Sequence, residues 1–261
     1  MFEIVSNIFV FLSGICIGSF LNVCVYRMGR EQSVVKPSSR CPHCQKPIRW
    51  FDNIPLLSFL LLRGKCRDCG GKISFRYFFI ELLTGVIFLA LYRDLGLSDR
   101  FFAYAILLSG LIVATFVDFD FQIIPDEISL GGIAVGLIFS FLFPTIHSTP
   151  LHWLGLWDSF LGVLVGGGIL WILGCLGDFI FKKESMGGGD VKLLAMIGAF
   201  LGWKMALLTL PLASVVGAIA GIIVKIRTKQ SLIAFGPYLS LGALICIFWS
   251  GAILSFFFTL K

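Results

Sequence analysis

Residues 101–117 read FFAYAILLSGLIVATFV, seventeen positions without a charged side chain. A helix needs about 20 mainly apolar residues to cross the hydrocarbon core of a bilayer, so this stretch predicts a membrane-spanning helix. The other apolar stretches are continuous runs, unlike the alternating segments of about ten residues that form membrane β-barrels. They fall at about 5–26, 78–92, 128–143, 159–180, 188–202, 205–224 and 234–258. We therefore expect an all-α polytopic membrane protein with about eight transmembrane helices.

The overall composition agrees with a membrane protein. Of the 261 residues, 57% are hydrophobic and only 14% are charged, whereas soluble domains are about 45–50% apolar and about 25% charged. A soluble fold would lack the polar side chains needed to cover its surface. The composition thus excludes a soluble enzyme, a disordered chain, a disulfide-rich secreted scaffold and a nucleic-acid binder, and membrane lipid is the expected surrounding.

Basic side chains are distributed unevenly between the predicted loops. Residues 27–76 contain eleven of the 21 lysines and arginines. If this loop is cytoplasmic, six more basic residues lie on the same side: Lys182, Lys183, Lys192, Lys225, Arg227 and Lys229. The remaining four lie on the opposite side: Arg93, Arg100, Lys204 and Lys261. The positive-inside rule therefore predicts that both termini are outside the cytoplasm.

Four of the eight cysteines form two C-x₂-C pairs in this loop, Cys41 with Cys44 and Cys66 with Cys69. Two such pairs are typical of a zinc ribbon, in which four thiolates surround one Zn²⁺ tetrahedrally. Four sulfur ligands leave no open position, so the predicted zinc is structural. Two disulfides are the alternative, which a reducing cytosol disfavours. We divide the chain into a first transmembrane helix (1–26), a cytoplasmic zinc-ribbon loop (27–76) and a transmembrane core (77–261).

Two short motifs place carboxylates at the ends of predicted helices, DFDFQIIPD at 118–126 and GGGD at 187–190. Asp118 follows one helix and Asp190 begins another, and both helix ends face the cytoplasm in the predicted orientation. The two side chains could therefore form an aspartic-protease dyad. In such a dyad one carboxylate activates water and its protonated partner polarises the scissile carbonyl. The alternative is that Asp118 and Asp126 only mark helix ends and Asp190 caps a helix N-terminus.

Two further acidic residues, Glu81 and Asp178, fall within or at the edge of predicted membrane helices. Carboxylates in such positions are costly and are candidate functional residues, although pairing with a nearby arginine would explain each equally well. Intramembrane acids also suit a transporter or channel, but here they gather at one membrane surface rather than at the midplane. A structural scaffold that docks through its zinc loop is a third possible class of protein. This hypothesis does not explain the two aspartate motifs.

The chain resembles the bacterial type IV prepilin peptidases over nearly its whole length. The G-x-G-D motif alone is weak evidence, because presenilin-like intramembrane proteases share it, but the full set in this order is highly specific. The motifs that carry the resemblance are Gly18-Ser-Phe-Leu-Asn-Val23, the two cysteine pairs, Asp52-Asn-Ile-Pro55, Arg76-Tyr77 with Glu81, Asp118, Ile124-Pro-Asp126, Gly187-x-Gly189-Asp190 and Phe235-Gly-Pro-Tyr238.

The resemblance implies an inner-membrane enzyme with two activities and an active site at the cytoplasmic face. Members of this family use the aspartates that match Asp118 and Asp190 to cleave the basic leader of prepilins and pseudopilins after a glycine. They then methylate the new N-terminal residue with S-adenosylmethionine. The loop 27–76 is the expected methyl-transfer region, because it is the one sizeable cytoplasmic element beside the new N-terminus. A Rossmann site is excluded, since the chain has no glycine-rich loop after a strand. The sequence does not identify the residues that bind S-adenosylmethionine.

Overall fold

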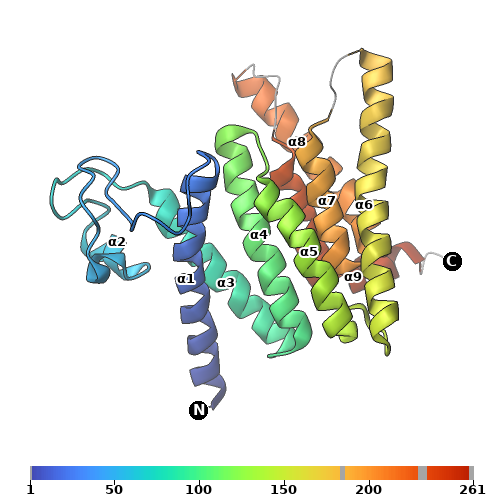
Figure 1. Cartoon of the computed structure of the whole chain (residues 1–261), viewed down its shortest axis with the longest axis horizontal. Helices are drawn as coiled ribbons and strands as arrows, with labels where there is room; N and C mark the ends of the chain where they lie inside the picture. Colours follow the sequence, from blue (N-terminus) through green and yellow to red (C-terminus); the bar gives the residue numbers. More distant parts are fainter. Residues whose placement is uncertain (1, 183–185, 229–233, 259–261) are drawn as a thin grey trace. The chain divides into compact units, whose positions relative to one another are not determined.

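The computed structural model describes residues 2–182, 186–228 and 234–258. The chain divides into two compact units, Met1–Leu97 and Ser98–Lys261, drawn in blue to teal and in green to red in Figure 1. The described residues are nearly all helical, and their β pairing is limited to isolated bridges in the loop 27–76. The all-α class predicted from the apolar runs is therefore confirmed.

The first unit is built on two long helices, α1 (Phe2–Met28) and α3 (Phe75–Leu95). They approach closely because glycines line their contact. A Cβ atom on Gly14 would lie 2.8 Å from Cα of Gly85, and one on Gly18 would lie 2.8 Å from Cα of Glu81. Small residues spaced four apart allow such backbone contact between membrane helices. The connecting loop contains only two short elements, η1 (Trp50–Asn53) and α2 (Leu57–Leu61).

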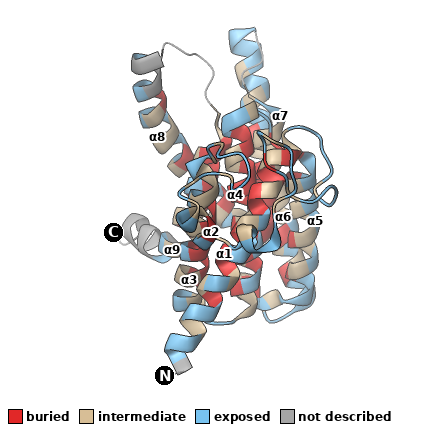
Figure 2. Ribbon diagram, turned by 90° about the vertical axis from the view of Figure 1, so that its left-hand side faces the viewer, coloured by how far each residue is buried: buried red, intermediate tan, exposed pale blue. Residues whose placement is uncertain are grey.

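The second unit is a helical bundle arranged around α7 (Gly188–Leu201). This helix packs against α4, α5, α6, α8 and α9, and all of its residues from Leu193 to Phe200 are buried (Figure 2). The neighbours of α7 are α4 (Asp99–Phe121), α5 (Asp126–Leu142), η2 (Pro144–His147), α6 (His152–Phe181), α8 (Trp203–Thr228) and α9 (Gly236–Phe258).

Each of the eight apolar stretches predicted from the sequence is helical, but fewer than eight of these helices are long enough to span a membrane. Among the described residues, five helices are long and apolar enough to cross a bilayer: Glu3–Met28, Phe75–Leu95, Asp99–Phe121, His152–Phe181 and Trp203–Ile223. The helices α5 and α7 are shorter, and so is the apolar part Gly236–Trp249 of α9. The protein is thus a multi-pass membrane protein, and a count of eight spans is not confirmed.

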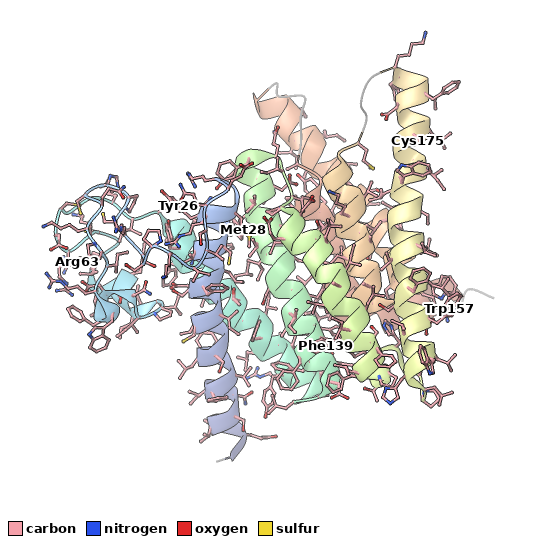
Figure 3. All side chains as sticks on the ribbon, in the orientation of Figure 1. Tyr26, Met28, Arg63, Phe139, Trp157 and Cys175 are labelled. Atoms are coloured by element: carbon pink, nitrogen blue, oxygen red, sulfur yellow. The ribbon has the colours of Figure 1, made fainter. Side chains whose placement is uncertain are left out.

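The helix α6 exposes apolar side chains that suit a lipid environment. Trp157 and Cys175, labelled in Figure 3, are both exposed on it. Its opposite face carries Gly162 and Gly166, one turn apart, where it meets α7. A Cβ atom on Gly166 would lie 2.6 Å from the Leu194 carbonyl oxygen, and one on Gly162 would overlap the carbonyl of Gly198. This glycine contact fixes α7, which begins with the G-x-G-D motif.

The glycine contact between α6 and α7 predicts a position-specific effect on stability. The change Gly162→Ala should destabilise the protein by about 1–3 kcal/mol, because the added methyl group overlaps the α7 backbone. Gly168 lies on the same helix with open space around its Cβ position. The control Gly168→Ala should therefore keep or slightly raise the stability. Thermal melting in detergent compares the two variants, and equal melting temperatures would contradict the packing described here.

Candidate active site and cysteine cluster

Asp118 lies in the last turn of α4, where the helix ends in a left-handed residue. Gln122 adopts φ 55° and ψ 36°, and its backbone N–H donates to the Asp118 carbonyl oxygen at 2.9 Å. The side chain of Asp118 is only 5% exposed, although the neighbouring Phe119 is 57% exposed. The end of α4 therefore turns one carboxylate into the bundle and leaves an apolar ring on the surface.

The buried carboxylate of Asp118 is held by the first residue of α9. The backbone N–H of Gly236 donates to Oδ2 of Asp118 at 2.9 Å. A Cβ atom on residue 236 would lie 2.7 Å from this oxygen, so only glycine allows the contact without a shift. The N-terminus of a helix also carries a partial positive charge that favours an anionic partner. The F-G-P-Y motif at 235–238 thus supplies a backbone donor to Asp118.

Asp190 lies in the first turn of α7, close enough to Asp118 for the two carboxylates to interact electrostatically. Ile124 joins their surroundings. A Cβ atom on Gly189 would lie 3.1 Å from Cβ of Ile124, and one on Gly236 would lie 3.2 Å from Cδ1 of the same residue. Three motifs that are distant in the sequence therefore meet at one place. Two neighbouring carboxylates disfavour ionisation of both, so such a pair can share one proton.

The other acidic residues of these motifs lie outside the carboxylate pair. Asp126, in the first turn of α5, accepts a hydrogen bond from Nζ of Lys192 at 2.7 Å. Both side chains are partly exposed, and an ion pair of this kind contributes about 0–1 kcal/mol. It connects the start of α5 to the start of α7. Asp120 and Asp178 are exposed.

Basic residues lie at both ends of the second unit. Lys182 follows α6 and Lys192 lies in the first turns of α7, at the end that holds the carboxylate pair. Arg100 lies at the opposite end of α4 from Asp118, where it donates to the Thr145 carbonyl and the Ser148 hydroxyl. Lys183, Lys229 and Lys261, which also entered the predicted orientation, lie outside the described residues.

The four loop cysteines meet in one cluster in the first unit. The sulfur atoms of Cys41, Cys44, Cys66 and Cys69 all lie within 4.8 Å of one another. Cys41 and Cys69 come from different pairs, and their sulfur atoms are 3.8 Å apart. Four sulfurs bound tetrahedrally at about 2.3 Å from zinc would be about 3.8 Å apart. The donor set and its spacing therefore fit one zinc ion.

The two cysteine pairs lie in turns of the same construction. In the first turn, the N–H of Cys41 bonds to the Lys46 carbonyl and the N–H of Gln45 bonds to the Cys41 carbonyl. In the second, Cys66 bonds in the same way to Gly71, and Gly70 bonds to Cys66. Gln45 and Gly70 both have positive φ, 59° and 68°. The repeated geometry points both pairs of thiols toward a common centre.

The thiols of the cluster influence one another's ionisation. Burial acts to raise the pKa of Cys41, but hydrogen bonds with the backbone of Cys44 and His43 and with the Cys66 and Cys44 thiols lower it to about 7. At Cys69, a hydrogen bond with the backbone of Gly71 acts to lower the pKa. Burial and the other three thiols outweigh it and raise the pKa to about 11. A cation among the sulfurs would favour the thiolate form of the four cysteines.

His43 lies between the first two cysteines but does not belong to the cluster of four sulfurs. Its Nε2 atom is 3.0 Å from the Lys72 carbonyl oxygen, so it links the first cysteine turn to the second. A second link comes from Arg67, which binds Asp52 in two-pronged fashion with its Nη2 atom 2.6 Å from Oδ1. Hydrogen bonds from Arg67 lower the pKa of Asp52. This pair connects the second turn to η1.

Glu81 is buried in α3, where it is 8% exposed. Its Oε2 atom accepts the backbone N–H of Leu56 at 2.8 Å, and the Ser19 side chain forms a further hydrogen bond with it. Leu56 has a positive φ of 59° with ψ −50°, at the centre of a tight turn in which the Leu57 N–H donates to the Pro55 carbonyl. Sequence reasoning identified Glu81 as unusual but did not identify these partners. It likewise gave no signal for the Gly236 donor or for the pair of Asp126 with Lys192.

Comparison with known proteins gives two family matches. Residues 12–95 match the bacterial peptidase A24 N-terminal domain, and residues 105–222 match the type IV leader peptidase family. A prepilin leader peptidase/N-methyltransferase of Aeromonas hydrophila is 35% identical, covering 96% of this chain and 93% of the relative. A type 4 prepilin-like proteins leader peptide-processing enzyme of Escherichia coli is 38% identical over 91% of both chains.

A further relative is longer than this chain. The prepilin leader peptidase/N-methyltransferase of Myxococcus xanthus is 39% identical over 86% of this chain, and the match spans 64% of that protein. No solved structure matches the chain.

The sulfur cluster predicts about one zinc ion per chain, measured by metal analysis of the purified protein in detergent. Changing Cys41, Cys44, Cys66 or Cys69 to serine should lower the zinc content, because a tetrahedral thiolate site loses one of its four ligands. Cys175→Ser is the matched control, since Cys175 is exposed on α6 and far from this loop in the sequence. Disulfide-linked cysteines, or protein that contains no metal, would contradict the prediction.

Proposed function

This chain belongs to the type IV leader peptidase family, and from that premise we propose that it cleaves the basic leader of type IV prepilins and pseudopilins with Asp118 and Asp190 as its catalytic pair. The observation that carries the proposal is the buried carboxylate of Asp118, bonded to the Gly236 N–H at 2.9 Å and next to Asp190. A structural helix cap would require neither the burial nor the second carboxylate.

The surroundings of the two carboxylates suggest which one acts as the base. Both carboxylates lie at a helix N-terminus, which favours a negative charge, but Asp118 also accepts a backbone N–H, from Gly236, and such a donor favours the charged form of a carboxylate. Asp118 would then activate the attacking water. Asp190 would hold the shared proton and donate it to the carbonyl oxygen of the scissile bond. Gly188 has open space around its Cβ position, which leaves room for an extended peptide to approach.

The charge and polarity around the pair suit a pilin precursor. We place the pair at the cytoplasmic face, with both termini outside, because seventeen of the 21 lysines and arginines then lie inside. A prepilin offers its scissile bond where a charged leader meets an apolar helix. Phe119 and Ile123, next to the site, are 57% and 47% exposed and could contact that apolar helix.

We further propose that the loop 27–76 holds a structural zinc through Cys41, Cys44, Cys66 and Cys69 and forms the methyl-transfer region. S-adenosylmethionine supplies the methyl group when bound: the new N–CH₃ bond forms as the S–CH₃ bond breaks, sulfur keeps the electron pair as a thioether, and the amine proton passes to water. This chemistry requires a neutral amine held in line with the methyl group. It makes no use of a carboxylate dyad.

The proposed catalytic roles predict that Asp118→Asn and Asp190→Asn each reduce leader cleavage to background. Asparagine cannot gain or lose the proton that both steps require. Cleavage of a purified prepilin in detergent, followed by gel mobility, measures the loss, and melting temperature reports the fold. Asp120→Asn and Asp126→Asn are controls that should retain most of the activity. Cleavage by either variant of the pair would show that the dyad is wrongly assigned.

The two activities are expected to be separable. The double variant Asp118→Asn, Asp190→Asn should still methylate a pre-cleaved pilin, since methyl transfer depends on positioning rather than on the dyad. Disruption of the cysteine cluster should reduce methylation at least as severely as cleavage. Transfer of radiolabelled methyl groups to the pilin N-terminus measures methylation by the double variant and by the cysteine-cluster variant. A folded double variant without methyl transfer would mean that the two reactions share one site.

A further inference from the structure

The first unit contains a cavity of about 670 Å³ between the helices α1 and α3 and the loop 27–76. Its size falls within the range of about 300–1,000 Å³ that is usual for small-molecule sites. The helices contribute Ser19, Asn22, Tyr77 and Glu81 to its lining. Neither aspartate of the proposed dyad lines it. A ligand of this cavity would therefore be a molecule other than the peptide that is cleaved.

The three acidic residues that line the cavity differ in their partners. Asp52 is bound by Arg67 at 2.6 Å, and Asp68 lies 3.5 Å from Arg49. The hydrogen bonds of Glu81 come from neutral donors, the Leu56 N–H and the Ser19 side chain. A carboxylate in a membrane helix is costly unless it has a partner, and its default interpretation is a functional site. Glu81 thus has the environment expected of a group that receives a cation from a ligand.

Other side chains supply the remaining parts of a binding site for a cationic nucleoside. Tyr26 and Tyr77 line the cavity with aromatic rings. Arg30 covers one face of Tyr26, 4.2 Å from the ring centroid, so a purine would stack on Tyr77 or on the other face of Tyr26. In Figure 3, Tyr26 projects from α1 toward the loop. Arg40 and Lys72 line the loop side and can bind an α-carboxylate. The ring faces, the basic groups and the buried acid match the adenine, the carboxylate and the sulfonium of one molecule.

We propose that this cavity is the binding site for S-adenosylmethionine, with Glu81 facing the positively charged sulfur. The proposal rests on the methyltransferase activity proposed above and identifies its ligand site. It explains why a family motif places an acid at the seventh residue of α3, between the apolar residues Ile80 and Leu82. Glu81 also accepts the N–H of Leu56, which has a positive φ, so the test must separate the charge from this structural hydrogen bond.

The change Glu81→Gln makes that separation. Glutamine has nearly the same shape, and its carbonyl oxygen can still accept the Leu56 N–H, but the negative charge is lost. The readout is the ratio of two dissociation constants, for S-adenosylhomocysteine and for S-adenosylmethionine. The two ligands differ by one methyl group and one positive charge. A distorted cavity would weaken both ligands, whereas loss of the charge at Glu81 weakens only the preference for the cation.

Equilibrium binding to the purified full chain in detergent should give wild-type protein a preference for S-adenosylmethionine of at least about tenfold, an effect of about 1.4 kcal/mol. The preference should fall to about onefold to threefold in Glu81→Gln. Glu3→Gln is the matched control, because Glu3 is an exposed acid in the same unit, and it should keep the wild-type ratio. A ratio that is unchanged in Glu81→Gln overturns the proposal.

A second measurement uses only the wild-type protein, so it remains decisive if the variant does not fold. Photo-crosslinking of radiolabelled S-adenosylmethionine, followed by peptide mapping, should label peptides between Ser19 and Glu81. Label confined to residues 98–261 overturns the proposal. The failure of the proposed function would look different. If the protein shows the expected binding ratio but methylates no pre-cleaved pilin, the ligand site stands and the methyltransferase activity is refuted.

Discussion

A carboxylate buried among membrane helices must have a polar partner, and for Asp118 that partner is the backbone of Gly236. This hydrogen bond joins the end of α4 to the beginning of α9. The glycine contact of α6 with α7 then brings Asp190 to the same place. The pair is therefore formed by the ends of α4, α7 and α9, and the close contacts that bring them together depend on glycines.

The two units satisfy different physical constraints. The bundle Ser98–Lys261 buries its apolar central helix among five others, so the surrounding helices fix its geometry. The loop of the first unit has little apolar core and is instead held by repeated turns, the pair of Arg67 with Asp52 and the sulfur cluster. A metal can supply folding energy that such a loop lacks. This difference agrees with a division of peptide cleavage and methyl transfer between the two units.

The sequence predicted the features that depend on local pattern. Apolar runs located all eight long helices, and the cysteine spacing predicted the cluster. The position of Asp118 and Asp190 at the cytoplasmic face stays a prediction. Contacts between distant segments could not be predicted, because no local pattern indicates them. Examples are the Gly236 donor, the pair of Asp126 with Lys192, and the close backbone contact of Gly162 with Gly198. The apolar runs also did not determine the number of membrane spans, because a helix such as α7, with fourteen residues, is apolar since it is buried in the bundle.

The most direct test of this account is leader cleavage by the variant Gly236→Ala. An added Cβ atom would lie 2.7 Å from Oδ2 of Asp118 and displace the carboxylate from its backbone donor. Gly251→Ala is the matched control, because Gly251 lies in the same helix with open space around it. We predict that Gly236→Ala loses at least about tenfold in cleavage rate, equivalent to 1.4 kcal/mol, while the control retains it. Equal cleavage by the two variants would contradict the account.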